Sequence, residues 1–354
     1  MAREYEVEVF GQPSLYKASE RKFKIYFSEP DYGINNLTGI NLLINGYGAH
    51  PKSNVYKKMR NEFADKYNLV VLQCEYFGIE FMQTDSEIAY NELREKENEF
   101  IRIQYDSNEY YMKIIDKYQN ETLENMNDMG AIQAIDNLTA LKVVMDILKS
   151  NSFNFNRNKI IVYGHSHGAY LGHLCNLFAP NIFSALIDNS AYVYPTYLDD
   201  HNKRKTVRNL GGLLIMERYS YLISKVVFDK EFYNLDNLYS QVDNKCNIIC
   251  FQGIDDGLYD YKNKIKFIKN IKNAEAELIT SENLDNEVFK NTIHGVGADF
   301  IKMFEYVDNK YELENHNPNW GFTDIFYTTS KYEYMINNSG GVPRLNVNKI
   351  IDEK

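Results

Sequence analysis

The chain has 354 residues, of which 44% are hydrophobic and 25% are charged. This composition excludes a disordered chain and a small disulfide-stapled domain, and it leaves room for a large buried core. The formal net charge of −10 argues against a general attraction to nucleic acid or to anionic lipid.

Short runs of β-branched and aromatic residues alternate with segments of helical periodicity. The first two runs, at 5–10 and 22–27, alternate in polarity, which is typical of antiparallel strands at the edge of a sheet. Five later runs are apolar throughout, as expected of parallel strands buried on both faces: 40–44, 69–72, 160–163, 185–187 and 247–251. This succession predicts the α/β class with a mostly parallel sheet.

Three segments carry the apolar spacing of helices that pack on such a sheet. Apolar residues at three-to-four spacing predict a helix over 130–149. The same spacing in Val55, Met59 and Phe63 predicts a helix after the third strand, and another is expected near residue 300. These helices are expected to cover the sheet.

Two segments do not fit the alternation of strand and helix. We interpret residues 81–128 and 196–245 as insertions that form a lid or cap on a main domain spanning about residues 1–310. Residues 311–354 are interpreted as a C-terminal extension, which holds the only tryptophan, Trp320.

The N-terminus has no apolar signal segment, and no run of about 18 apolar residues occurs in the chain. We therefore expect a cytoplasmic protein without a membrane segment. The four cysteines form no C-x-x-C pair, so we expect reduced, mostly buried thiols rather than a zinc site or a disulfide framework.

One pentapeptide carries the strongest chemical signal. Gly164-His165-Ser166-His167-Gly168 directly follows the apolar run at 160–163 and precedes a segment that predicts a helix. A G-x-S-x-G sequence between strand and helix forms a sharp turn that presents its serine, and its glycines let strand and helix approach closely. The motif predicts that Ser166 is a nucleophile.

A serine hydroxyl is a weak nucleophile until a base removes its proton, so a histidine and an orienting carboxylate are required. Asp255 and Asp256 follow the apolar run at 247–251, and His294 lies in a glycine-flanked loop further on. The order serine, aspartate, histidine is that of one class of serine hydrolases.

With these residues the sequence resembles the α/β-hydrolase superfamily over about residues 1–310. It is similar to a poorly characterised bacterial group that shares the loop Asn45-Gly46-Tyr47-Gly48 and a His-Gly pair at the base. The resemblance implies a mostly parallel sheet with helices on both faces. It also favours Asp256 as the acid, because the acid of the superfamily commonly lies three residues after a glycine at the strand end. Asp255, and Asp188 one strand earlier, remain alternatives.

Stabilising an oxyanion requires two backbone N–H donors, one after the nucleophile and one from the loop after the third strand. His167 is the first candidate, and Tyr47 or Gly48 is the second. Aromatic residues at the predicted strand ends, where ligands of such sheets bind, are candidates for the substrate pocket: Tyr76, Tyr192 and Tyr194.

Other polar residues have simpler interpretations. His165, His167 and His173 lack the spacing of a metallohydrolase site, so we expect neither a metal nor a cofactor. His50 and His173 are expected to be structural. A basic run at 203–208 is expected to be a solvated face, with a lid contact for an anionic substrate as the alternative.

The residues together predict a serine hydrolase, a carboxylesterase or deacylase that works through an acyl-enzyme. The expected substrate is a small acyl ester, with an acylated sugar as one example. An acyltransferase or peptidase would use the same triad, and a non-catalytic relative whose tail beyond 311 docks a partner is the rival from another class.

Overall fold

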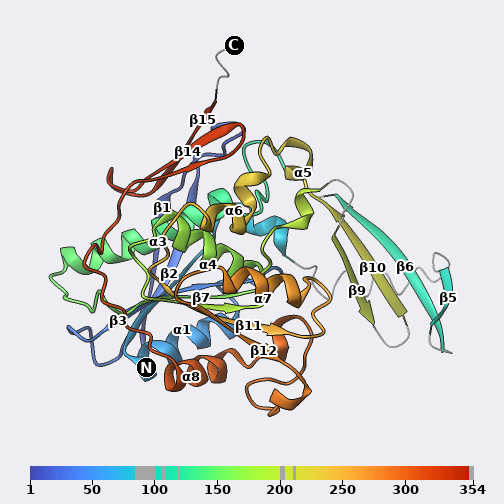
Figure 1. Cartoon of the computed structure of the whole chain (residues 1–354), viewed down its shortest axis with the longest axis horizontal. Helices are drawn as coiled ribbons and strands as arrows, with labels where there is room; N and C mark the ends of the chain where they lie inside the picture. Colours follow the sequence, from blue (N-terminus) through green and yellow to red (C-terminus); the bar gives the residue numbers. More distant parts are fainter. Residues whose placement is uncertain (84–100, 106–107, 119, 200–203, 210–212, 351–354) are drawn as a thin grey trace.

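The computed structural model describes residues 1–83, 101–105, 108–118, 120–199, 204–209 and 213–350, which contain three β-sheets (Figure 1). The largest sheet has eight strands in the order β1-β2-β4-β3-β7-β8-β11-β12. Their bounds are Arg3–Phe10 (β1), Lys22–Glu29 (β2), Gly39–Ile44 (β3), Leu69–Cys74 (β4), Ile160–His165 (β7), Ala185–Asn189 (β8), Asn247–Gly253 (β11) and Ala274–Ile279 (β12). The six strands from β4 to β12 are parallel, and β1 and β2 form the antiparallel edge.

The predicted strands of this sheet are confirmed, and the chain belongs to the α/β class. The sequence interpretation missed β12, whose Ala-Glu alternation contains no continuous apolar run. That pattern follows from its position, because an end strand is covered by a neighbouring strand on one side only. Most of β12 is only half-buried, whereas β3 and β4 are buried at every position.

Helices cover both faces of the eight-stranded sheet, as the sequence implied. The three predicted helices are confirmed in α1 (Asn54–Tyr67), α3 (Ala131–Ser150) and α8 (Phe300–Lys310). α3 packs on one face with two further helices, α4 (His167–Phe178) and α7 (Tyr261–Lys269). α1 and α8 share the other face, where the rings of Phe63 and Phe304 stack at 4.5 Å.

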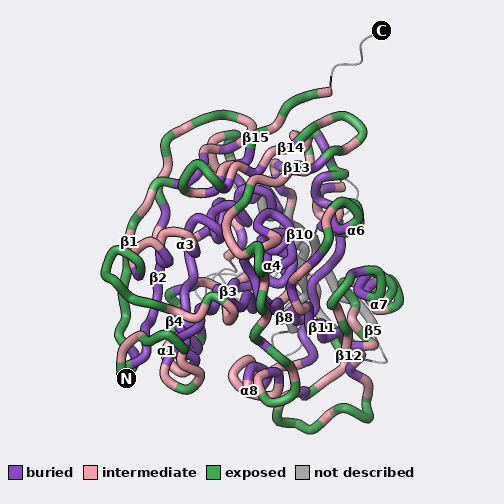
Figure 2. Tube along the Cα trace, turned by 60° about the vertical axis from the view of Figure 1, so that its left-hand side comes forward, coloured by how far each residue is buried: buried purple, intermediate pink, exposed green. Residues whose placement is uncertain are grey.

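Local capping residues set the ends of these helices. The Ser53 side chain accepts the N–H of Tyr56 at the start of α1, and Asp299 accepts the N–H groups of Ile301 and Lys302 at the start of α8. Across the molecule, residues at the sheet are buried and residues on the outer faces of the helices are exposed (Figure 2).

The two segments interpreted as insertions come together in one four-stranded sheet, in the order β5-β6-β10-β9, which projects from the body of the molecule (Figure 1). Its strands are Ile101–Tyr105 (β5), Asn108–Tyr118 (β6), Arg204–Asn209 (β9) and Leu213–Ser220 (β10). β6 and β10 are parallel and paired along eight residues, so both re-enter the body at the same end. The predicted basic run falls mainly on β9, with residue 203 outside the described residues.

Between this sheet and the main sheet, short elements complete the second segment: α5 (Ile223–Val226) and α6 (Leu235–Tyr239). The chain after α8 forms an antiparallel sheet of β13 (Ile325–Thr328), β14 (Tyr332–Asn337) and β15 (Arg344–Lys349). Its Tyr334 stacks on Phe232 at 3.7 Å, and the hydroxyl of Tyr327 donates to the carbonyl of Leu177 in α4. The C-terminal extension therefore packs against the main core through Tyr327 and Tyr334.

All four cysteines are buried, and none forms a disulfide. Across the described residues, no helix combines the length and the apolar character needed to cross a membrane.

Candidate active site

Ser166 occupies a sharp turn between β7 and α4. Its backbone has φ 54° and ψ −118°, a conformation that side chains rarely adopt. The two flanking glycines allow the turn: a Cβ on Gly164 would lie 2.3 Å from the carbonyl oxygen of Gly168, and one on Gly168 would lie 2.2 Å from that of Ile44. The turn places Ser166 at the carboxyl end of a central parallel strand, where ligands of such sheets bind.

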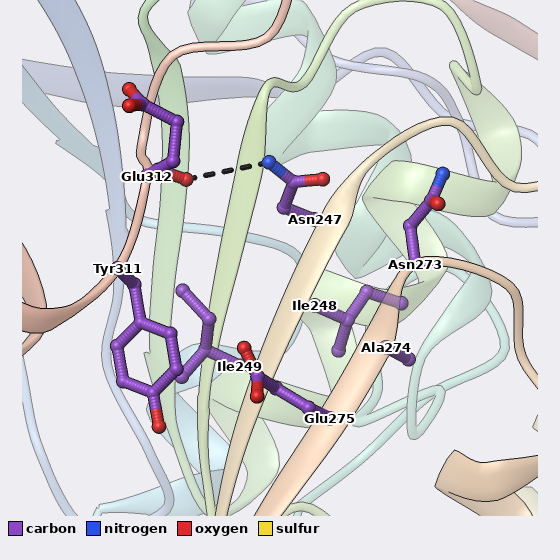
Figure 3. A pocket seen from close by; sticks show the side chains of 8 residues that line it. All are labelled: Asn247, Ile248, Ile249, Asn273, Ala274, Glu275, Tyr311 and Glu312. Carbon is purple, nitrogen blue, oxygen red and sulfur yellow. Dashed lines mark hydrogen bonds between the residues drawn. The ribbon is translucent and has the colours of Figure 1, made fainter.

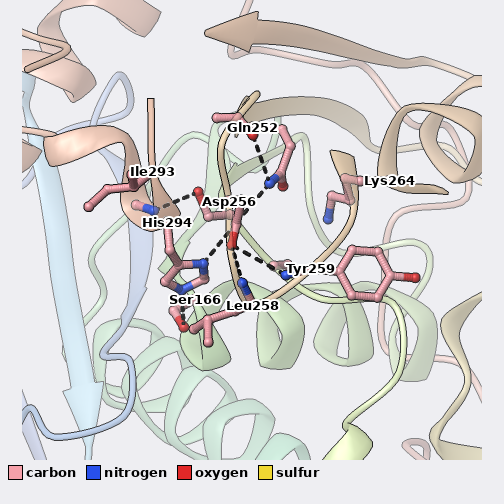
Figure 4. A network of polar contacts seen from close by, with 12 residues as sticks. Ser166, Gln252, Asp256, Leu258, Tyr259, Lys264, Ile293 and His294 are labelled. Carbon is pink, nitrogen blue, oxygen red and sulfur yellow. Dashed lines mark hydrogen bonds and ion pairs between the residues drawn. The ribbon is translucent and has the colours of Figure 1, made fainter. Parts of the chain in front are cut away.

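His294 reaches Ser166 from a loop that precedes α8 (Figure 4). Its Nε2 lies 2.8 Å from Oγ of Ser166, and its Nδ1 lies 2.9 Å from Oδ2 of Asp256. Because an ionised carboxylate can only accept, Nδ1 carries the proton and Nε2 accepts the serine hydroxyl. The imidazole is therefore oriented to remove the proton from Ser166.

The carboxylate of Asp256 is fully enclosed and accepts several hydrogen bonds. Oδ2 also accepts from the side chain of Gln252 at 2.7 Å, and Oδ1 accepts the N–H groups of Leu258 and Tyr259 at 2.8 and 3.3 Å (Figure 4). Burial alone would raise the pKa of this carboxyl, but the hydrogen bond from His294 and those from Leu258 and Gln252 hold the pKa below its ordinary value. Asp256 is thus kept ionised.

The alternative acids lie elsewhere. Asp255 is exposed, and its carboxylate accepts the hydroxyl of Thr292 at 2.6 Å. Asp188 is fully buried, with Oδ2 2.9 Å from Nε2 of His173 and 2.5 Å from Nζ of Lys264. Burial acts to raise the pKa of Asp188, but the Lys264 ammonium and His173 hold it well below its ordinary range. Neither carboxylate contacts His294.

The loop of His294 is fixed to the end of β8 by two residues that the sequence analysis missed. The N–H of Gly295 donates to Oγ of Ser190 at 3.0 Å, and the side chain of Asn189 donates to the carbonyl of Gly295 at 3.4 Å. Gly295 has φ 78°, and a Cβ there would lie 2.5 Å from Cε1 of His165. No sequence pattern links β8 to this loop, so the sequence could not predict these two hydrogen bonds.

His165 packs beside the imidazole of His294 rather than facing solvent. The two rings lie 5.9 Å apart, and the ring of Phe300 lies 5.1 Å from His165 on another side. Burial and the neighbouring His294 together lower the pKa of His165 to about 4. His165 is therefore neutral in the folded protein at pH 7.

The two candidate oxyanion segments meet at Ser166. A Cβ on Gly46 would lie 3.5 Å from Cβ of Ser166, so the backbone that leads to Tyr47 passes beside the nucleophile. The N–H of Gly48 donates to the carbonyl of Met82 at 2.9 Å, which favours Tyr47 over Gly48 as the second candidate donor. His167, the other candidate, begins α4 and is buried.

Buried partners hold the side chain of His167. Its Nδ1 is hydrogen-bonded to the hydroxyl of Tyr192, and its Nε2 lies 2.6 Å from Oε1 of Gln133. Since an amide oxygen can only accept, Nε2 carries the proton and Nδ1 accepts from Tyr192. Gln133, in α3, is a further residue that the sequence analysis missed.

The three candidate pocket tyrosines have different surroundings. Tyr76 is buried, and its hydroxyl donates to the carbonyl of Asn45 at 3.2 Å. Tyr192 is buried against His167, as described above, and stacks on Tyr170 at 4.7 Å. Tyr194 is half-buried, and its hydroxyl donates to Asp199 at 3.2 Å. Tyr76 and Tyr192 therefore support the loops on either side of Ser166.

A polar cleft of about 850 Å³ lies at the same edge of the sheet as Ser166. Its lining includes His50, from the loop after β3, and Tyr76, from the loop after β4. Three residues lie between His50 and Gly46, which is beside Ser166, so the loop after β3 runs from the Ser166 turn to this cleft. As expected, His50 also has a local role, because its Nδ1 accepts the N–H of Lys52 at 3.2 Å.

A second pocket, of about 320 Å³, lies at the opposite end of the strands (Figure 3). It is lined by the first residues of β11 and β12, and the side chain of Asn247 donates to the carbonyl of Glu312 at 3.3 Å (Figure 3). Because Ser166 lies at the carboxyl ends of the strands, this pocket is separate from the candidate site.

Within the ranges that the structure describes, no three His, Cys, Asp or Glu side chains gather as a metal site would require. His173, one of the histidines near the elbow, is fully buried, with Nδ1 2.9 Å from the hydroxyl of Tyr239 and Nε2 on Asp188. It is a packed helix residue, as expected.

Comparison with known proteins adds information on the fold. A family model described as "Protein of unknown function (DUF2920)" matches residues 117–199, and no curated protein matches. Acylaminoacyl peptidase from Pyrococcus horikoshii has a TM-score of 0.50 with 13% identity, over 91% of this chain and 43% of that one.

Two esterases are also similar. Est1E from Butyrivibrio proteoclasticus with bound ferulic acid has a TM-score of 0.47 and 13% identity, over 81% of this chain and 93% of that one. An esterase from Rhizomucor miehei has a TM-score of 0.48 and 11% identity, over 87% of this chain and 82% of that one. With the sheet order and the serine turn, the match to the peptidase shows that this chain has the α/β-hydrolase fold.

Proposed function

We propose that this protein is a serine hydrolase that cleaves carboxylic esters through an acyl-enzyme on Ser166. The observation that carries the proposal is the continuous hydrogen-bonded series from Ser166 through His294 to the buried carboxylate of Asp256. Each member has the role that acyl transfer requires: nucleophile, base and orienting acid.

In the first step, Oγ of Ser166 attacks the ester carbonyl while Nε2 of His294 takes the hydroxyl proton. The electron pair of the carbonyl moves to its oxygen, and the backbone N–H groups of His167 and Tyr47 are the proposed donors to that oxyanion. Asp256 stabilises the imidazolium. The tetrahedral intermediate then collapses, the C–O bond to the alcohol breaks, and His294 gives its proton to the leaving oxygen.

Water then repeats the sequence in the second step. His294 removes a proton from water, the hydroxide attacks the acyl carbon, and the Ser166 ester bond breaks as Oγ regains its proton. A free acid and the original enzyme result. We propose a small ester as the substrate, with an acylated sugar as one example, because the cleft at this edge of the sheet has a polar lining.

Several features argue against a purely non-catalytic binding protein. The nucleophile is held in a costly backbone conformation, and Asp256 is saturated with hydrogen bonds that keep it charged. A non-catalytic protein would gain nothing from the strained backbone at Ser166 or from the ionised carboxylate of Asp256. The C-terminal extension, which that alternative would use for docking, is packed into the core.

A panel of esters with graded acyl chains, O-acetylated sugars and matched amides tests the proposal. The purified protein is expected to hydrolyse at least one ester, and Ser166→Ala is expected to lower turnover by at least about a thousandfold. Ser240→Ala, an exposed serine in the same protein, is the control and should retain full activity. Equal rates in Ser166→Ala and Ser240→Ala would contradict the proposal.

A further inference from the structure

A tyrosine from the second insertion contacts the loop that passes beside Ser166. Tyr221 follows the last residue of β10 and is buried, and its hydroxyl lies 2.5 Å from the hydroxyl of Tyr47. The two rings also meet edge to face, with centroids 6.5 Å apart. The loop that holds one proposed oxyanion donor is therefore attached to the root of the insertion sheet.

Glu121 joins the roots of the two insertions. One carboxylate oxygen accepts the N–H of Leu222 at 2.6 Å, and the other accepts the N–H of Asn127 at 2.8 Å. Glu121 lies just after β6, and Leu222 lies just after β10. Because β6 and β10 are parallel, one carboxylate can hold both chains where they re-enter the body.

The hydrogen bonds continue from Asn127 to His167, the first residue of α4. The side chain of Gln133 donates to Oδ1 of Asn127 at 2.9 Å, and its Oε1 accepts from His167 at 2.6 Å. A polar belt, defined here as Tyr47, Tyr221, Leu222, Glu121, Asn127, Gln133 and His167, thus connects the two segments proposed to form the oxyanion hole. Glu121 is its central member and its only carboxylate.

We propose that Glu121 is a positioning residue for the oxyanion hole. By holding the roots of both insertions together, Glu121 fixes the Tyr47 loop relative to His167, and the insertion sheet becomes part of the catalytic framework. This inference rests on the proposed function, because it concerns the stabilisation of an oxyanion at Ser166.

Glu121→Gln tests the proposal with almost no change of shape. A glutamine has one carbonyl oxygen, so its NH₂ group would face a backbone N–H and one of the two hydrogen bonds would be lost. We expect kcat to fall about tenfold while KM changes less than about twofold, since oxyanion stabilisation acts in the transition state. The matched control is Glu305→Gln, whose side chain pairs with Lys66 at the surface of α8 and should change kcat less than about twofold.

Titration with a fluorophosphonate separates positioning from loss of folded protein. If Glu121 positions the oxyanion hole, each Glu121→Gln molecule still has one reactive Ser166, and phosphonylation is slower but complete. Tyr221→Phe should give a similar loss of kcat. The double variant should lower kcat by a smaller factor than the product of the two single-variant factors, because both residues act through one belt.

Three outcomes decide between the possibilities. A kcat for Glu121→Gln within twofold of that for Glu305→Gln, or a loss that is fully explained by fewer titratable serines, would overturn the inference. If Glu121→Gln does not fold, a kcat for Tyr221→Phe equal to wild type would overturn it. Failure of the proposed function is distinct, because the wild-type protein itself would then show no labelling at Ser166.

Discussion

Oδ2 of Asp256 lies 2.9 Å from Nδ1 of His294, although 38 residues separate the two in the chain. The neighbouring carboxylate, on Asp255, is exposed and accepts from Thr292 instead. Two adjacent acids of the same loop therefore have different surroundings, and only one of them can orient the imidazole.

Asp256→Asn and Asp255→Asn form a matched pair for this relationship. An asparagine at 256 presents an amide that favours the wrong tautomer of His294, so we expect kcat to fall on the order of 10⁴-fold. Asp255→Asn is expected to change kcat by less than about threefold. Steady-state kinetics with any ester that the wild-type protein hydrolyses would measure both, and the reverse order of effects would contradict the assignment of the acid.

Gly168 is expected to tolerate no side chain. A Cβ there would lie 2.2 Å from the carbonyl oxygen of Ile44, so Gly168→Ala should lower the free energy of unfolding by about 3 kcal/mol or more. Gly257→Ala, near the acid, meets nothing within 4 Å and should change it by less than about 0.5 kcal/mol. Urea unfolding measures both values, and equal stabilities of the two variants would contradict the tight contact.

The buried ion pair of Lys264 and Asp188 predicts a large cost for removing one partner. Both side chains are fully buried, with Nζ and Oδ2 2.5 Å apart. Lys264→Met would remove the ammonium that balances the buried charge of Asp188, and we expect a loss of about 3–5 kcal/mol in the free energy of unfolding. Lys262→Met, on an exposed position of the same helix, is the control, and a similar small effect of both substitutions would be inconsistent with this ion pair.

Stability should depend on pH through His165. Its pKa is lowered to about 4 in the folded protein, whereas an ordinary histidine has a pKa of 6.5. Below pH 6.5 the unfolded chain binds the proton first, so the stabilisation is fully present above that pH and is lost as the pH falls toward 4. Between pH 7.5 and pH 5 the contribution amounts to about 2 kcal/mol.

His165→Leu should remove this dependence, because leucine takes up no proton and suits the packing against Phe300. The free energy of unfolding of wild type should fall more steeply than that of His165→Leu between pH 7.5 and pH 5. His316→Gln, at an exposed position in the C-terminal extension, should keep the wild-type slope. Parallel curves for wild type and His165→Leu would show that His165 is not the group responsible.

The parts of the fold that could be predicted are those with a local pattern. The apolar runs of β3, β4 and β7 and the periodicity of α3 identified their elements directly. The pairing of β6 with β10 could not be predicted, because about 100 residues separate the strands and no sequence feature sets their register. The edge strand β12 was missed because half-buried strands lack a continuous apolar run.

The candidate site divides in the same way. Ser166, Asp256 and His294 could be selected as candidates because the proposed nucleophile, acid and base follow a known order around a local motif. Gln133, Ser190 and Glu121 had no such signal, because each acts through a hydrogen bond to a distant segment that only the folded chain brings close. Residues that support a site are thus harder to find from one sequence than residues that perform its chemistry.

The most direct test of the central claim is to trap the acyl-enzyme. The protein would be mixed with an activated ester, quenched with acid within one turnover, digested and analysed by peptide mass spectrometry. We predict that one acyl group is present on the peptide that contains Ser166, and that His294→Ala forms the adduct far more slowly. Ester hydrolysis with no adduct on that peptide, or with an adduct on another residue, would contradict the account.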